Sequence, residues 1–171
     1  LAEGLRKGNR IAWIGKNSDL YFSLFYGAAR AGIVMVPIGW RLAPAEWAFI
    51  ANDTGARVLF TGRGFEGAGD VLAELAGPLE RVIAEDEARG LIDATARVDF
   101  AAAEPDDAVL QLYTSGTTGN PKGAMYTHRS TYLHTMVVCM ADTVGVSARD
   151  SLCEIVPMFH AMSWGMPFAA N

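Results

Sequence analysis

The sequence predicts an α/β fold in which helices flank a mostly parallel sheet. Short apolar runs alternate with amphipathic stretches in the first half of the chain, which is the pattern of repeated β-α units. Glycine, proline and short polar residues stand between these segments, where helix caps and turns belong. Apolar residues make up 51% of the 171 residues, so the chain can bury one substantial core. These observations together indicate one globular domain.

The first β-α-β unit is predicted to have strands at residues 10–14 and 34–37, with a helix between them. Asn17 and Ser18 are suitable N-caps for this helix, and Gly32 stands where its C-terminal cap belongs. One face of the helix is apolar and should face the sheet. That face consists of Leu20, Tyr21, Leu24, Phe25 and Ala28.

The next predicted elements are a helix at 44–54, a strand at 58–60, a short helix at 71–75 and a strand at 81–83. Seven acidic residues follow. They are Glu85, Asp86, Glu87, Asp93, Asp99, Glu104 and Asp106. Clustered carboxylates invite a catalytic or metal-binding interpretation, but their irregular spacing among alanine and glycine favours a solvated connecting surface.

A buried strand at 108–112 leads into the sequence Tyr-Thr-Ser-Gly-Thr-Thr-Gly-Asn-Pro-Lys-Gly at 113–123. The ten residues after Tyr113 include three glycines, four hydroxyl side chains and one lysine, with no large apolar group. Free backbone N–H groups, hydroxyl donors and the charge of Lys122 suit a phosphate. A flexible linker would not need Pro-Lys-Gly or flanking strands, and a Walker loop would need Gly-Lys-Ser/Thr. We therefore predict a phosphate-binding loop.

This motif resembles the signature loop of the adenylate-forming enzymes, which include acyl-CoA synthetases, luciferases and the adenylation domains of peptide synthetases. The resemblance implies that the loop binds ATP, that Lys122 is also catalytic, and that Thr114 is the remaining candidate ligand for Mg²⁺. The implied ATP-binding residues are Thr114, Ser115, Gly116, Thr117, Thr118, Gly119 and Lys122. The implied reaction joins a carboxylic acid to AMP with release of pyrophosphate, and then passes the acyl group to CoA.

The resemblance also implies that the chain is part of the large N-terminal domain of such an enzyme. Residues 1–106 would be scaffold β-α units, and residues 107–171 would carry the phosphate loop and an acyl-site segment. The family's C-terminal domain, with its catalytic lysine, has no counterpart here. We therefore expect a fragment that is inactive by itself, and the full-length parent to be the enzyme, an AMP-forming ATP-dependent acyl-CoA ligase.

Beyond the loop, the pattern predicts a strand at 123–127, a helix at about 131–144 and a last strand at 152–156. His128 or Ser130 is the expected helix cap, and His134 is interpreted as a partly buried structural histidine. The helix should face the core through one apolar side. That side consists of Leu133, Met136, Val137 and Met140.

The final segment, Pro-Met-Phe-His at 157–160 followed by Trp164, resembles the acyl-binding region of fatty-acid–CoA ligases. The resemblance implies that His160 binds the carboxylate or acyl-adenylate, since an imidazole can hydrogen-bond its oxygen. The alternative is a histidine that caps the next helix. Trp164 either gates an apolar acyl tunnel or is a core tryptophan. Nearby Met158, Met162 and Met166 suit an adaptable tunnel, or plain core.

Histidine offers no fixed anion for an ammonium group, so a fatty or aryl acid is favoured over an amino acid, and the resemblance implies a fatty acid of medium or long chain. Aryl or amino acids, and a non-catalytic nucleotide-binding remnant, stay open as alternatives. The net charge of −5 and the lack of a basic stripe disfavour nucleic acid as a partner. No apolar run is long enough to span a membrane. Cys139 and Cys153 are predicted to be buried free thiols in a reducing cytoplasm. Homodimerisation of the full-length protein stays open.

Overall fold

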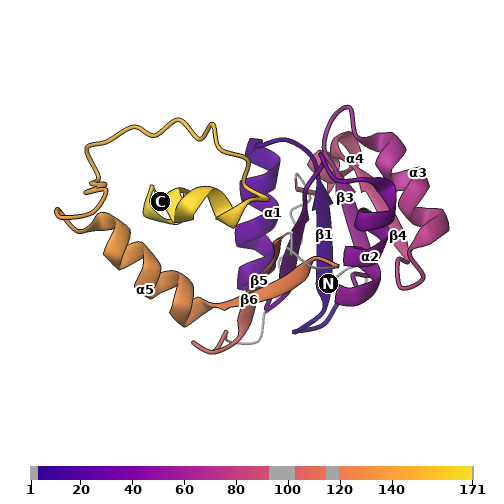
Figure 1. Ribbon diagram of the computed structural model, residues 1–171, viewed down its shortest axis with the longest axis horizontal. Coiled ribbons are helices and arrows are strands. Elements are labelled where there is room, and N and C mark those ends of the chain that lie inside the picture. Colours follow the sequence, from indigo (N-terminus) through magenta and orange to yellow (C-terminus); the bar gives the residue numbers. More distant parts are fainter. Residues whose placement is uncertain (1–3, 93–102, 115–119, 171) are drawn as a thin grey trace.

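The computed structural model describes residues 4–92, 103–114 and 120–170 and contains a six-stranded sheet (Figure 1). The strand order is β4-β3-β1-β2-β5-β6. Strands β1 to β5 are parallel, and β6 is antiparallel to β5. Their bounds are β1 Arg10–Ile14, β2 Val34–Ile38, β3 Val58–Thr61, β4 Arg81–Ala84, β5 Ala108–Thr114 and β6 Lys122–Thr127. The predicted α/β fold with a mostly parallel sheet is confirmed.

Helices cover both faces of the sheet. The α-helices are α1 Asp19–Arg30, α2 Pro44–Thr54, α3 Glu66–Leu75, α4 Glu85–Ile92, α5 His128–Cys139 and α6 Met166–Ala169, and a 3₁₀ turn η1 spans Ala161–Gly165. Helices α1 and α4 pack on one face, and α2 and α3 pack on the other. Figure 1 shows α5 and α6 on the far side of α1 from α2 and α3. The two cores lie between these layers and the sheet.

The first β-α unit forms where the sequence predicts it. Ser18 begins α1, because its Oγ accepts a hydrogen bond from the Tyr21 N–H at 3.2 Å. Gly32 follows the helix with φ +68°, a conformation that glycine adopts without a Cβ clash. Trp13 of β1 meets Tyr21 edge to face, with ring centroids 5.7 Å apart, and both side chains are buried. Trp13 is therefore a packing group of this core.

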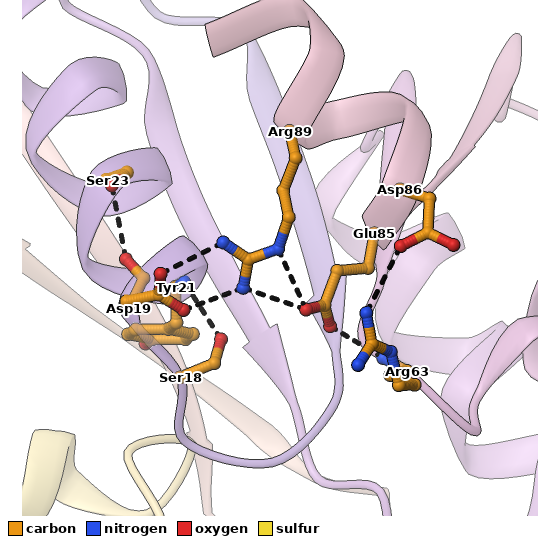
Figure 2. Close-up of polar contacts among 8 residues, drawn as sticks. All are labelled: Ser18, Asp19, Tyr21, Ser23, Arg63, Glu85, Asp86 and Arg89. Carbon is orange, nitrogen blue, oxygen red and sulfur yellow. Dashed lines mark hydrogen bonds and ion pairs between the residues drawn. The ribbon is translucent and has the colours of Figure 1, made fainter. Parts of the chain in front are cut away.

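Of the acidic residues expected to form a solvated connecting surface, the first three begin helix α4, while Asp93 and Asp99 lie outside the described residues. Figure 2 shows how its carboxylates are paired. Arg89 bridges Glu85, at 2.8 Å, and Asp19 at the start of α1, at 2.7 Å. Glu85 is only 9% exposed and also accepts a hydrogen bond from the Arg63 N–H at 2.8 Å. Asp86 in turn pairs with the Arg63 guanidinium. This network joins α1, α4 and the loop after β3.

The C-terminal third differs most from prediction. Helix α5 starts at His128 rather than near 131, and neither His128 nor Ser130 is its cap. Thr127 is the N-cap, and its side chain accepts a hydrogen bond from the Ser130 N–H at 3.1 Å. The described residues 152–156 form no strand. Instead the chain after α5 makes a wide arc before it returns to α1 (Figure 1).

The predicted core face of α5 is exposed to solvent. Its four apolar side chains are between 50% and 60% exposed. Among the residues that the structure describes in α5, Val138 is the only buried one. Cys139 and Cys153 are free but exposed, so the prediction of buried thiols is wrong. His134 is exposed as well, although its ring packs against the backbone of Gly165. No helix in the described part of the chain has the length and apolar character needed to cross a membrane.

The Asp19–Arg89–Glu85 network should make the stability of the fold depend on pH. Hydrogen bonding to Arg89 lowers the pKa of Asp19 from 3.8 to about 2, and the pKa of Glu85 is also lowered, mainly by the Arg63 N–H and then by Arg89. Carboxylates with a lowered folded-state pKa stabilise the fold at neutral pH and lose that effect as pH falls through the folded pKa. The free energy of unfolding that Arg89→Met removes at pH 7 should therefore shrink as pH falls from about 4.5 toward 2.

Urea denaturation of wild type and variant at a series of pH values measures this difference. Arg149→Met is the matched control, since Arg149 has no ion-pair partner among the residues that the structure describes. A loss of stability for Arg89→Met that stays constant across this pH range would contradict the expectation.

Candidate functional site

The two ends of the glycine-rich loop lie side by side. Thr114, the last residue of β5, is directly opposite Lys122, the first residue of β6. Since β5 runs parallel to β2, this pair lies at the carboxyl edge of the parallel strands, where ligands collect in open α/β sheets. Both residues are exposed. The predicted nucleotide-binding residues Ser115, Gly116, Thr117, Thr118 and Gly119 lie outside the described residues.

A tight cross-strand contact stands at the base of this loop. Tyr113 is directly opposite Gly123 in the hairpin. A Cβ atom at Gly123 would lie 2.7 Å from Nε2 of Gln111 and 3.0 Å from Cζ of Tyr113. Only glycine therefore fits beneath the tyrosine ring without a shift of these side chains. The sequence analysis placed Gly123 at the start of the predicted strand 123–127 and missed this packing role.

The hydroxyl of Tyr113 also ties the hairpin to helix α2. It donates a hydrogen bond to the Asp53 carboxylate and accepts one from Nε2 of Gln111 at 3.1 Å. Burial, followed by the contact with Asp53, raises the pKa of Tyr113 well above its usual value, so the hydroxyl stays protonated at neutral pH. The strand that enters the loop is thereby anchored on the α2 side of the sheet. Because side chains alternate along a strand, Thr114 and Lys122 lie on the other face, which α1 covers.

The segment that carries His160 crosses the carboxyl ends of β1 and β2. The Met158 N–H donates to Oδ1 of Asn17, in the loop after β1, at 2.8 Å. Phe159 packs on Gly39 and Trp40, which follow β2, with 6.4 Å between its ring centroid and that of Trp40. The expectation that His160 follows a strand end of its own is wrong, because 152–156 is not a strand. Its segment nevertheless lies at the same edge of the sheet as Thr114 and Lys122, and the His160 side chain is exposed.

The turn after His160 has an unusual backbone. Ala161, Met162 and Ser163 have φ values of +48°, +45° and +50°, in the left-handed region. This conformation costs roughly 1–2 kcal/mol for each residue that has a Cβ. The segment after His160 therefore does not form a right-handed helical turn. The side chain of Trp164 lies outside the described part of the structure, so its assignment to the acyl site stays a prediction.

An open, mostly parallel sheet with a glycine-rich loop and a second polar segment at its carboxyl edge is the arrangement of a nucleotide- or small-molecule-binding α/β protein. Comparison with known proteins makes this more specific. The chain belongs to the family of AMP-binding enzymes, since the family matches residues 1–170.

Two curated relatives and one solved structure illustrate the similarity. The chain is 35% identical over 185 residues to a medium-chain-fatty-acid–CoA ligase of Ectopseudomonas oleovorans, covering 98% of this chain and 33% of the relative. It is 39% identical over 163 residues to the long-chain-fatty-acid–CoA ligase FadD13 of Mycobacterium tuberculosis, covering 93% of this chain and 32% of that protein. The chain thus spans about a third of the length of these relatives.

The fold agrees with the sequence comparison. The inhibitor-bound N-terminal domain of FACL13 from Mycobacterium tuberculosis superposes with a TM-score of 0.89 at 36% identity, over 99% of this chain and 43% of that domain's chain. The sheet and the flanking helices described above are therefore those of the N-terminal domain of an adenylate-forming enzyme.

The contact between Gly123 and Tyr113 gives a stability prediction. Gly123→Ala should lower the free energy of unfolding by about 1–3 kcal/mol, because the added methyl group overpacks the site beneath Tyr113. Gly67→Ala is the matched control, since Gly67 lies in helix α3 with open space around it and should be stabilised slightly by alanine. Chemical denaturation of both variants measures the difference. Equal stabilities of the two variants would show that Tyr113 and Gln111 move aside freely.

Proposed function

We propose that the full-length protein carrying this chain is an ATP-dependent acyl-CoA ligase. It would join a carboxylic acid to AMP, release pyrophosphate, and then transfer the acyl group to CoA. The observation that carries the proposal is the pairing of Thr114 with Lys122 at the mouth of the signature loop, at the same sheet edge as the His160 segment. Membership of the AMP-binding family supports it.

The residues of this chain would bind and orient the reacting groups. Lys122 is exposed and lies opposite Thr114, so the described residues offer a positive charge and a hydroxyl group that suit a phosphate at the strand ends. The loop would hold the pyrophosphate portion of ATP while a carboxylate oxygen bonds to the α-phosphorus and the bond to pyrophosphate breaks. In the second step the sulfur of CoA would bond to the acyl carbon, and AMP would leave. His160 would bind the carboxylate or the acyl-adenylate oxygen.

The described residues could supply only a small part of the ligands of a Mg²⁺ ion. The described residues contain no group of three or more His, Cys, Asp or Glu side chains that could hold a metal ion. Thr114 would contribute a single neutral hydroxyl. Mg²⁺ commonly keeps several waters and binds substrate phosphates together with one or two carboxylates. We therefore propose that ATP carries most of the ligands, with Thr114 as a supplementary one.

A fatty acid is the proposed substrate, supported by the relatives and by the histidine at position 160. The methionine argument is weaker than the sequence suggested, because Met158 and Met162 are 1% and 2% exposed and pack in the core with Tyr21. Aryl acids, amino acids and a non-catalytic remnant are the competing interpretations. A cytoplasmic location is part of the proposal, since a reducing compartment would keep the two exposed thiols free.

An exchange assay tests the proposed function. The full-length protein is incubated with ATP and labelled pyrophosphate in the presence of short, medium and long fatty acids, aryl acids and amino acids. Label should enter ATP only when a suitable acid is present, and medium or long fatty acids should be the best. Absence of exchange with every acid would favour the non-catalytic remnant.

The role of Lys122 can be tested in the same assay. Lys122→Ala should lower the exchange rate by about 10²-fold, because it removes a positive charge placed to stabilise the developing pyrophosphate. The melting temperature should hardly change, since an exposed lysine contributes little to folding. Lys16→Ala is the matched control, because Lys16 is an exposed lysine in the loop after β1. Exchange that survives Lys122→Ala at the wild-type rate would remove this residue from the site.

A further inference from the structure

The amide of Asn17 joins the loop after β1 to the segment that leads to His160. Its Nδ2 donates hydrogen bonds to the backbone carbonyls of Glu154 and Val156, at 3.1 and 2.8 Å. Its Oδ1 accepts the hydrogen bond from the Met158 N–H at 2.8 Å. One side chain therefore satisfies three backbone groups that lie 137 to 141 residues further along the chain.

Hydrogen bonds also hold the C-terminal end of this segment in place. Oγ of Ser163 donates to the Val156 carbonyl at 2.6 Å, so this carbonyl accepts from both Asn17 and Ser163. The Tyr21 hydroxyl, on the buried face of α1, donates to Sδ of Met162 at 2.9 Å. These bonds close a loop of residues 156–163, in which His160 is exposed while Met162 and Ser163 are buried.

The left-handed backbone of Ala161, Met162 and Ser163 needs such contacts in order to persist. A strained turn persists only where contacts with its surroundings offset the free-energy cost of its backbone conformation. Here the restraints are the Asn17 amide, the Tyr21 hydroxyl and the Ser163 hydroxyl. Release of any one of them should let the turn relax and move His160.

We propose that Asn17 is a positioning residue for the acyl site: it fixes the backbone before His160, so that the imidazole is held where the acid binds. This inference rests on the proposed function, because it assumes that His160 meets the acid. It assigns to Asn17 an effect on the acid and not on ATP, since among the described residues the side-chain hydrogen bonds of Asn17 go to the segment before His160.

Two substitutions separate the donor and acceptor parts of the amide. Asn17→Ala removes all three hydrogen bonds. Asn17→Asp keeps an acceptor for the Met158 N–H but turns a carboxylate oxygen toward the carbonyls of Glu154 and Val156. Asn52 supplies a matched control, because its amide also bridges backbone groups, donating to the Leu75 carbonyl at 3.2 Å and accepting from the Gly77 N–H at 3.0 Å.

In the full-length protein, Asn17→Ala should lower kcat/KM for the preferred acid at least tenfold, while KM for ATP changes less than about twofold. Asn52→Ala should leave both constants near their wild-type values, whatever it does to the melting temperature. If Asn17 acts through His160, then Asn17→Ala should have little further effect in a His160→Ala background. Effects of the two substitutions that multiply fully, or an Asn17→Ala variant with unchanged kcat/KM for the acid, would overturn the proposal.

Amide hydrogen exchange gives a readout that is independent of activity. The Met158 N–H should exchange much faster in Asn17→Ala but stay protected in Asn17→Asp, where its acceptor remains. Unchanged protection in Asn17→Ala would overturn the restraint itself. Wild-type protein that shows no acid-dependent pyrophosphate exchange would instead refute the proposed function, and the hydrogen-exchange result would still stand for or against the restraint.

Discussion

The parallel pairing of β1, β2 and β5 is the constraint on which the site depends. Every residue of β2 is buried, and β1 and β5 pair with it in the same direction. Parallel strands that are covered on both faces end at one common edge. The loop after β1, the loop after β2 and the glycine-rich loop after β5 are therefore brought to that edge by the sheet itself, although they lie up to about a hundred residues apart in sequence.

Much of the fold could be predicted from the sequence where an element is determined by its own residues. The bounds of β1 and the start and end of α2 follow from apolar runs, a proline at the first helical position and a glycine after the last. The glycine-rich motif indicated the family to which the chain belongs. Helix α4 was missed because its first turn, Glu85 to Glu87, is acidic and resembles a solvated segment. Arg89 pairs with Glu85 within the helix, four residues apart, but the contacts with Arg63 and with Asp19 join positions that no periodicity connects.

The other incorrect predictions from the sequence share a physical cause. Leu133, Met136 and Val137 have the spacing of a core face, but spacing does not say what covers that face, and here solvent does. Residues 152–156 are apolar enough for a strand but pair with no strand in the part of the chain that the structure describes. Asn17 was read as a helix cap, whereas Ser18 caps α1 and the Asn17 side chain contacts backbone 137 or more residues away. A polar residue beside a cap can serve a long-range contact that the sequence does not reveal.

The antiparallel direction of β6 has a consequence for how phosphate charge is balanced. In many nucleotide-binding folds the glycine-rich loop runs straight into a helix, whose N-terminal dipole helps to neutralise the anion. Here the loop runs into a strand, and α5 begins only at His128. If the loop binds phosphate as proposed, charge compensation from the described residues would fall on the exposed Lys122. Point charges at a surface are screened by dissolved ions within about 10 Å at 0.1 M salt, so the proposed nucleotide binding should weaken as ionic strength rises.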